Sequence, residues 1–379
     1  TKYPKSSKLE CFQSPAGYAL MSRLRSENKA FEPYEIARIH ARKRIESIRS
    51  MYKNDRGLLR KNLDALIGDT SPVNIDMNGV TIKDCGSWNG AAIQGVWLPA
   101  EPAGAASIGV SVWVCLPAGG KAKRPAVLGI SQEGKARFLA ERGGEIRTML
   151  EQGIAVALVD VRGTGETSPG DNRLPQGPSS TLASEMWMLG DSMPARRLKD
   201  VRTVLSYLAG RDDIDEARIG LWGEGFSDPN GISEKSLIFN ETGFRQKGPE
   251  PKSLAEPVGG LLALCAGLYP VGENNIKTVL CRGTLFSFMS VLEKPHHYIP
   301  MDAVIPGMLR VCDTADVVEA LELGHVRVLC EDLRDGRNRV VTKGDLRKSW
   351  NSDAEKTYTP YPAHGTIERI ITDLKRGLK

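Results

Sequence analysis

Residues 218–228 read R-I-G-L-W-G-E-G-F-S-D and decide the expected fold of this 379-residue chain. The first half is a short apolar run that ends at Trp222 and is typical of a buried β-strand. In the second half glycine and serine replace the apolar residues, which marks a tight turn at the strand end. Small residues at Gly223 and Ser227 allow the strand and the next element to close together, and the residue midway between them is Gly225.

The segments around this strand alternate between two periodicities. Early in the chain, short runs in which apolar and polar residues alternate are separated by Gly, Pro and Asn, a pattern that predicts antiparallel strands. Later, uninterrupted apolar runs typical of parallel strands alternate with amphipathic helices. We therefore expect an α/β sandwich, with a mostly parallel sheet, antiparallel N-terminal strands and helices on both faces. Strands are predicted at 80–82, 92–98, 108–114, 125–130, 154–161, 219–222, 260–268 and 325–333, and helices at 138–150, from Asp191 or Ser192 to 208, and at 367–378.

The chain is expected to divide into a helical arm, residues 1–70, and an α/β domain, residues 71–379. Apolar residues at helical spacing between charged ones predict an amphipathic helix that lies across the main domain: Ile36, Ile39, Ile45, Ile48 and Met51. Two Pro-rich stretches, at about 228–257 and 294–306, interrupt the α/β rhythm. Long loops in a compact domain are usually walls or lids of a site. The first stands where a helix should follow the strand at 219–222, so that helix is expected to be short or displaced.

The composition is that of an ordinary globular protein, with 41% hydrophobic and 26% charged residues. The net charge of +5 is spread along the chain, so no nucleic-acid partner is expected. No apolar run approaches the roughly 20 residues of a membrane helix. The seven cysteines form no C-x-x-C or Cys/His cluster, and neither a metal nor a cofactor is expected. Because the chain starts at Thr1, export after removal of a leader is one expectation, and the compartment is otherwise open.

A second glycine-rich turn, D-V-R-G-T-G-E-T at 160–167, follows a buried strand. It resembles the D-x-R-G-x-G-x-S/T segment of acetyl xylan esterases, cocaine-esterase-like enzymes and X-prolyl dipeptidyl peptidases. The 218–227 stretch likewise resembles the R-I-x-L-W-G-x-S-x-G nucleophile elbow of these α/β-hydrolases, which usually ends G-D-S-F-A in a bacterial acetyl xylan esterase-like subgroup. The resemblance covers roughly residue 80 to the C-terminus. It implies the α/β-hydrolase fold, with Asp160 and Arg162 bracing the turn beside the active site.

The resemblance also implies a catalytic triad in the order nucleophile, acid, histidine. The nucleophile position falls on Gly225. The acid is expected at Asp335, with Asp332 as the runner-up, and the base at His364, which precedes the last helix. A turn aspartate before glycine and a surface histidine before a helix would give the same pattern.

The backbone N–H groups of Phe226 and of the Ser131–Gln132 turn are expected to form the oxyanion hole. His297, in the second Pro-rich loop, is a candidate for a substrate contact.

Three accounts of Gly225 are open. In the first, Ser227 is the nucleophile, although Pro229 would then stand where the elbow needs a small residue. In the second, an engineered substitution removed the serine. In the third, the chain is a natural pseudo-hydrolase, or Glu224 and His364 activate water without a covalent intermediate. Glu224 is equally the variable residue of the motif, where any side chain is tolerated.

The expected function is hydrolysis of carbohydrate esters by a carboxyl-ester hydrolase of the acetyl xylan esterase-like type, with no cofactor and with the catalytic serine replaced. The alternatives are a non-catalytic ligand-binding protein with this fold, and a hydrolase or lyase that activates water through His364 with Glu224 or Asp335. A prolyl-type peptidase is a weaker third reading, since no accessory domain is visible. The oligomeric state is open.

Overall fold

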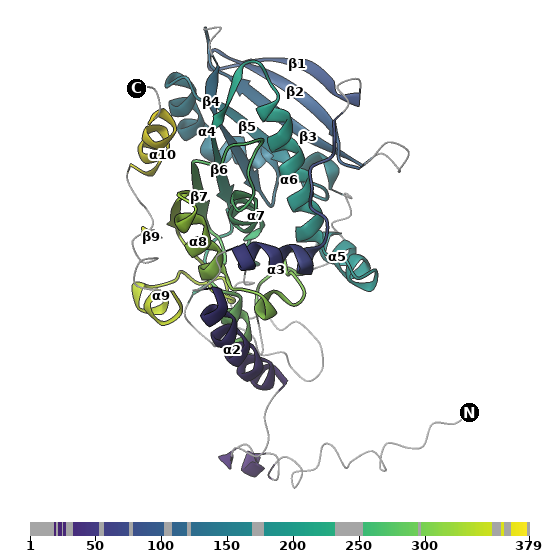
Figure 1. Cartoon of the computed structure of the whole chain (residues 1–379), viewed down its shortest axis with the longest axis vertical. Helices are drawn as coiled ribbons and strands as arrows, with labels where there is room; N and C mark the ends of the chain where they lie inside the picture. Colours follow the sequence, from purple (N-terminus) through teal and green to yellow (C-terminus); the bar gives the residue numbers. More distant parts are fainter. Residues whose placement is uncertain are drawn as a thin grey trace, which may run out of the picture.

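Nine strands in the described part of the chain form one sheet, in the order β1-β2-β3-β5-β4-β6-β7-β8-β9 (Figure 1). The first three strands run antiparallel to their neighbours, and β5, β4, β6, β7, β8 and β9 are parallel. The strands are β1 Thr81–Trp88, β2 Ala91–Pro99, β3 Gly109–Leu116, β4 Arg124–Ser131, β5 Ala155–Asp160, β6 Ile214–Glu224, β7 Thr278–Arg282, β8 Arg327–Glu331 and β9 Tyr358–Thr359.

This computed structural model describes residues 33–52, 57–75, 79–101, 108–119, 123–168, 178–231, 253–294, 297–350, 358–359, 365–376 and a few residues between 19 and 27. Its longer helices are α2 Pro33–Tyr52, α3 Gly57–Ile67, α4 Lys135–Glu151, α5 Pro178–Met188, α6 Met193–Ala209, α7 Val258–Gly267, α8 Thr314–Leu323, α9 Lys343–Ser349 and α10 Thr366–Lys375.

Helices cover both faces of the sheet, as the sequence predicts. On one face α4 and α10 enclose a core that includes Phe138, Trp222 and Ile370. On the other face α3, α6, α7 and α8 share a larger core. Because β4, β5 and β7 are buried on both sides, they read as uninterrupted apolar runs, whereas β1 is exposed along most of its length.

The predicted strand at 260–268 is wrong, because these residues belong to helix α7, Val258–Gly267. Every residue of this helix is buried, so its sequence carries no polar face. A short apolar run of this kind cannot be assigned to helix or strand by periodicity alone. The strand that follows β6 in the sheet is β7, a five-residue segment that the sequence analysis did not single out.

Helix α7 lies unusually close to β6, because both carry glycine at the contact. A Cβ at Gly223 would lie 2.4 Å from the Gly259 carbonyl oxygen, and a Cβ at Gly260 would lie 1.9 Å from the Thr284 hydroxyl oxygen. Helix α7 is the first helix after the strand–turn at 218–228 among the described residues. That the stretch at about 228–257 is a loop insertion stays a prediction, because residues 232–252 lie outside the described residues.

Helices α2 and α3 form where the amphipathic pattern predicts helix. In α2, Ile45 and Ile48 are buried, whereas Ile36 is 45% exposed. Helix α3 contributes Leu59 and Leu63 to the same core as α6 and α7. The division into a separate arm and domain stays a prediction.

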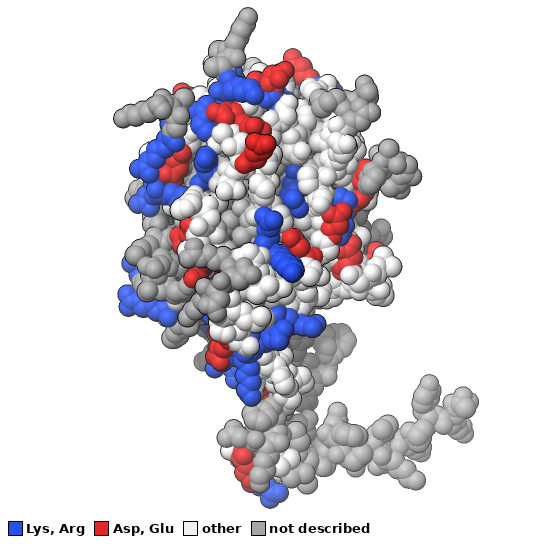
Figure 2. Space-filling view, in the orientation of Figure 1, with Lys and Arg blue, Asp and Glu red and all other residues white. Residues whose placement is uncertain are grey.

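The surface is mixed in charge. On the face shown in Figure 2, Lys and Arg alternate with Asp and Glu and do not form a field of one sign. None of the helices in the ranges given above is long and apolar enough to cross a membrane.

Replacing Gly223 by Ala should destabilise the fold by about 1–3 kcal/mol or more, because the new methyl group would meet helix backbone that cannot rotate away. The matched control is Gly144→Ala in α4, where a Cβ has nothing within 4 Å; it should be neutral or stabilise by up to about 1 kcal/mol. Urea unfolding of both variants measures the difference. Equal stability of Gly223→Ala and the unchanged protein would contradict the close packing.

Candidate functional site

The carboxyl ends of β4 and β6 lie where the sheet order reverses, which is the place of the active-site cleft in α/β-hydrolases; in this chain the last residues of both strands are buried there. From β4 the chain crosses to β5 on one side and then to β6 on the other, so connections leave the two strand ends in opposite directions. Ser131 and Glu224, the last residues of these strands, are register partners. Open α/β sheets bind ligands at such switch points.

At the nucleophile position the chain continues straight instead of forming a strained elbow. The N–H of Gly225 donates a 2.9 Å hydrogen bond to the Arg282 carbonyl oxygen, which extends the pairing of β6 with β7. Gly225 does not adopt the positive φ at which glycine is favoured. A Cβ at residue 225 would lie 2.3 Å from the Glu256 carbonyl oxygen and 3.0 Å from that of Gly283. Backbone from the end of the insertion thus occupies the space of a nucleophilic side chain.

The predicted oxyanion donor, the N–H of Phe226, binds a carboxylate of the same chain. It donates a 2.9 Å hydrogen bond to Oε2 of Glu256. Arg137 of α4 reaches Oε1 of Glu256 at 3.4 Å and the Phe226 carbonyl oxygen at 3.4 Å. Burial raises the pKa of Glu256 above its ordinary value, against the opposing effects of the Phe226 N–H and Arg137.

Side-chain amides hold the two ends of the insertion together. Asn230 exchanges two 2.9 Å hydrogen bonds with the backbone of Ser253, one in each direction. Asn338, fully buried and at φ 55°, donates to the carbonyl oxygens of Asp228 and Ser253. The turn that contains Asn338 therefore supports the return of the chain toward Glu256.

Asp335, the first choice for the acid, shapes this turn. Its Oδ1 accepts hydrogen bonds from the N–H groups of Arg337 and Arg339, and its Oδ2 pairs with the Arg339 side chain at 2.6 Å. Asp332, the runner-up, follows β8 directly at φ 50° and binds Nη2 of Arg334 at 2.5 Å. Burial raises the pKa of Asp332 above its ordinary value. Both remain predictions for the acid, and only Asp332 stands at the strand end.

Glu224 is a completely buried carboxylate with three donors. Its Oε1 accepts from the indole N–H of Trp222 at 2.6 Å and from Arg282 at 3.2 Å, and its Oε2 accepts from Arg142 at 3.0 Å. Burial raises the pKa of Glu224, and the two guanidinium groups oppose that shift. With its oxygens engaged and no exposed surface, Glu224 is placed to organise the cleft rather than to meet water.

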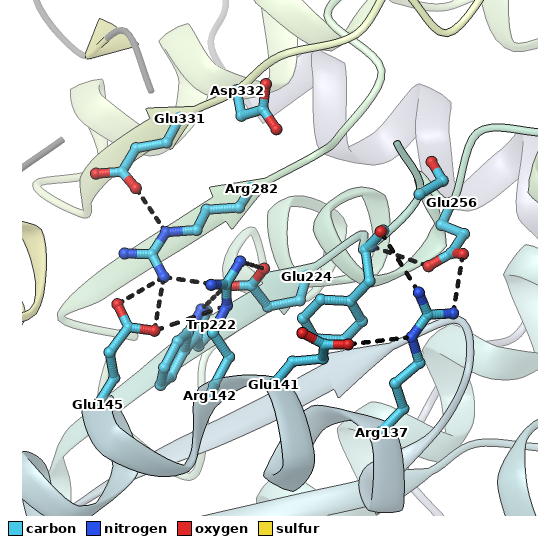
Figure 3. A network of polar contacts seen from close by, with 12 residues as sticks. Arg137, Glu141, Arg142, Glu145, Trp222, Glu224, Glu256, Arg282, Glu331 and Asp332 are labelled. Carbon is cyan, nitrogen blue, oxygen red and sulfur yellow. Dashed lines mark hydrogen bonds and ion pairs between the residues drawn. The ribbon is translucent and has the colours of Figure 1, made fainter. Parts of the chain in front are cut away.

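Arg282, at the end of β7, is the hub of this network (Figure 3). It also pairs with Glu145 of α4 at 2.8 Å and with Glu331 of β8 at 2.5 Å. Glu331 in turn accepts a hydrogen bond from the Thr366 hydroxyl at the start of α10. The network therefore ties the ends of β6, β7 and β8 to the residue two positions after His364, which itself lies outside the described residues.

Arg162 and Asp160 brace the D-V-R-G-T-G turn, the role that the resemblance implies. Arg162 is held by Asp200 at 2.6 Å and by Glu101 at 2.9 Å. Asp160 accepts from the backbone N–H of Lys135 at 2.6 Å and from its ammonium group at 2.5 Å. These contacts fix the start of α4 beside the cleft, and they occupy the side chain of Arg162.

The remaining predicted residues flank the cleft or lie outside it. The Ser131 hydroxyl is buried and donates to the Gly134 carbonyl oxygen at 2.9 Å, which closes the β4–α4 turn. Gln132 follows it, with a buried Oε1 that has no hydrogen-bond partner among the described residues. Ser227 is half-buried, and its carbonyl oxygen lies 3.5 Å from Nη2 of Arg334. His297 is exposed.

A separate groove of about 540 Å³ lies between α4 and the antiparallel strands. Two tryptophans, Trp88 and Trp113, line it, with Asn89 and Arg147 as its polar members. Gly143 and Gly144 line the groove in the middle of α4, where they add no side chain that would fill it. A Cβ at Gly143 would lie 3.2 Å from the Trp88 ring. Among the described residues no group of three or more His, Cys, Asp or Glu is placed to hold a metal ion.

The sequence analysis missed Glu256, Arg142 and Arg282, the side chains that fill the cleft. Arg282 ends a strand that was not recognised, and Arg142 lies among several charged residues of α4 with nothing local to distinguish it. The one available signal was Gly259-Gly260 in an apolar run, because adjacent glycines in a buried helix indicate a close backbone approach.

The order and directions of the strands, with helices on both faces, are those of the α/β-hydrolase fold, which the resemblance predicted. A chain from Bacteroides fragilis NCTC 9343 proposed to be an acetyl xylan esterase matches with a TM-score of 0.56 and 14% identity over 90% of this chain and 84% of that chain. The CE15 glucuronoyl esterase from Teredinibacter turnerae T7901 matches with a TM-score of 0.50 and 12% identity, over 86% and 85% of the two chains. No protein-family model and no curated protein matches this sequence.

Replacing Arg282 by Met should cost about 3–5 kcal/mol of folding free energy, because Glu224 and Glu331 would remain buried without their shared cation. The control is Arg147→Met on the exposed side of α4, whose ion pair with Glu151 is solvent-exposed and worth at most about 1 kcal/mol. Thermal or urea unfolding of the two variants measures both values. A loss no larger than that of the control would show that the buried network does not stabilise the fold.

Proposed function

We propose that this chain keeps the α/β-hydrolase fold, binds a small carbohydrate ester in the groove beside α4, and does not hydrolyse an ester through an acyl-enzyme at residue 225. Residue 225 carries the proposal. In hydrolases of this fold the acyl group is transferred to a side chain at this position. Glycine supplies no such atom, and a Cβ at residue 225 would lie only 2.3 Å from the Glu256 carbonyl oxygen.

Two observations support a carbohydrate ester as the ligand. One of the two similar structures described above is a chain proposed to be an acetyl xylan esterase, and the other is a glucuronoyl esterase. The groove beside α4 presents Trp88 and Trp113, and flat indole surfaces pack well against the C–H faces of sugar rings. Its volume lies within the range of about 300–1,000 Å³ common for ligand sites.

Direct activation of water by His364 with Glu224 or Asp335 has less support. Glu224 is fully buried and its oxygens bind Trp222, Arg142 and Arg282. The Asp335 oxygens are engaged in their own turn. A general base needs an oxygen or nitrogen free to reach the proton that it removes.

The second candidate is an ester hydrolase with Ser227 as nucleophile. Arg334 favours it, because one nitrogen of its guanidinium lies 3.5 Å from the Ser227 carbonyl oxygen and 2.5 Å from Asp332. Arg334 thus contacts both Ser227 and Asp332, the carboxylate at the end of β8. In this reaction the Ser227 hydroxyl would attack the ester carbonyl and His364 would pass its proton to the departing alcohol, while Asp332 orients the imidazole. Water would then hydrolyse the acyl–Ser227 ester and release the carboxylic acid.

Labelling with a fluorophosphonate separates the two candidates. We expect no labelling and no ester hydrolysis by the unchanged chain or by Ser227→Ala, and calorimetric binding of an acetylated xylo-oligosaccharide that is weaker for the deacetylated form. Gly225→Ser should also stay unlabelled and lose about 1–3 kcal/mol of stability, because its Cβ meets the Glu256 carbonyl oxygen.

Labelling of the unchanged chain that disappears in Ser227→Ala would establish the second candidate instead. Hydrolysis by Gly225→Ser would contradict the proposal that this position cannot hold a nucleophile, because the Glu256 backbone would then have moved to admit the new side chain.

A further inference from the structure

We infer that Glu256 is an internal ligand: its side chain fills a carboxylate-binding site formed by the Phe226 N–H and the Arg137 guanidinium, and a free small carboxylate binds there once that side chain is removed. The inference goes beyond the proposed function, since it concerns the place that the Glu256 side chain occupies and not the groove beside α4.

The donors are held in place by contacts that do not involve Glu256. One residue earlier, the Gly225 N–H donates a hydrogen bond to the Arg282 carbonyl oxygen, which fixes the Glu224–Gly225 peptide. The Phe226 ring lies 5.4 Å from the guanidinium carbons of both Arg137 and Arg142, and it meets the Phe138 ring edge-to-face at 6.0 Å. The N–H therefore keeps its position when the Glu256 side chain is absent, which is what a preorganised site requires.

Only one of three carboxylates around Arg137 reaches this N–H. Glu133 and Glu141 pair with Arg137 at 3.7 and 3.9 Å, and their side chains are 50% and 53% exposed. The Glu256 side chain is 12% exposed and bridges Arg137 and the Phe226 N–H with its two oxygens. Removing it leaves the half-buried Phe226 N–H without its acceptor, whereas Arg137, whose side chain is 37% exposed, keeps its pairs with Glu133 and Glu141. A buried donor without an acceptor costs free energy, and a new acceptor recovers part of that cost.

The bridging geometry selects the ligand class. One oxygen accepts from a backbone N–H and the other from a guanidinium, an arrangement that a planar carboxylate reproduces and a monatomic anion cannot. In the unchanged protein the tethered Glu256 is present at a high effective concentration, so a weak free carboxylate cannot displace it.

The test is thermal unfolding of Glu256→Ala in sodium formate or acetate against sodium chloride of equal ionic strength. We expect Glu256→Ala to melt below the unchanged protein and its Tm to rise saturably with formate by roughly 2–4 °C beyond the chloride effect. Glu141→Ala is the matched control: it also removes a carboxylate from Arg137, but Glu141 makes no contact with the Phe226 N–H in the described structure. It and the unchanged protein should respond equally to formate and chloride.

A formate response of Glu256→Ala no larger than that of Glu141→Ala would overturn the inference. If Glu256→Ala is unfolded in chloride, circular dichroism takes the place of the melting curve: folding restored by formate supports the site, and failure to restore it counts against the site. Glu256→Gln, which keeps an acceptor for the N–H, should fold and show no formate response; a response equal to that of Glu256→Ala would also overturn it. These outcomes do not depend on fluorophosphonate labelling, so a failure here is distinct from a failure of the proposed function.

Discussion

The close approach of backbone around β6 is the constraint on which the site depends. Gly223 faces Gly259 at the start of α7, and Gly225 faces the carbonyl group of Glu256, both at distances that no Cβ permits. A packed interior has no spare volume, so a side chain at either position would move the helix or the end of the insertion. The glycine at residue 225 therefore allows the Glu256 backbone to pack against it, and that backbone leaves no room for a side chain at residue 225.

A buried ionic network holds the strand ends in this arrangement. Three carboxylates, Glu145, Glu224 and Glu331, share the two guanidinium groups of Arg142 and Arg282 (Figure 3). A buried network of this kind contributes little net stability compared with apolar packing, but each member is costly to remove alone. Its consequence here is geometric: β6, β7, β8 and α10 meet at fixed positions around the cleft.

The chain after β6 returns to the strand end before the next helix begins. Where an elbow and helix follow directly, the nucleophile and the oxyanion donor face the substrate. Here the chain leaves β6, returns through the Asn230–Ser253 hydrogen bonds, and presents Glu256 to both places before α7 begins. Asp335, expected as an acid from its position in the sequence, shapes the turn that supports this return. A shared fold does not by itself fix the function of the residues at these strand ends.

The sequence by itself determined the α/β architecture, the strand and turn at 218–228, and the brace at Asp160 and Arg162, because each is encoded in a few consecutive residues. Only the tertiary structure decided the rest. The helix Val258–Gly267 has no polar face, because its neighbours bury it on every side. Its sequence therefore lacks the alternation of apolar and polar residues by which a helix is recognised. Glu256 reaches Phe226 across thirty residues, and Arg282 meets Glu145 and Glu331 from three separate elements. Contacts between residues so far apart in the chain depend on how the elements pack, which no local pattern records.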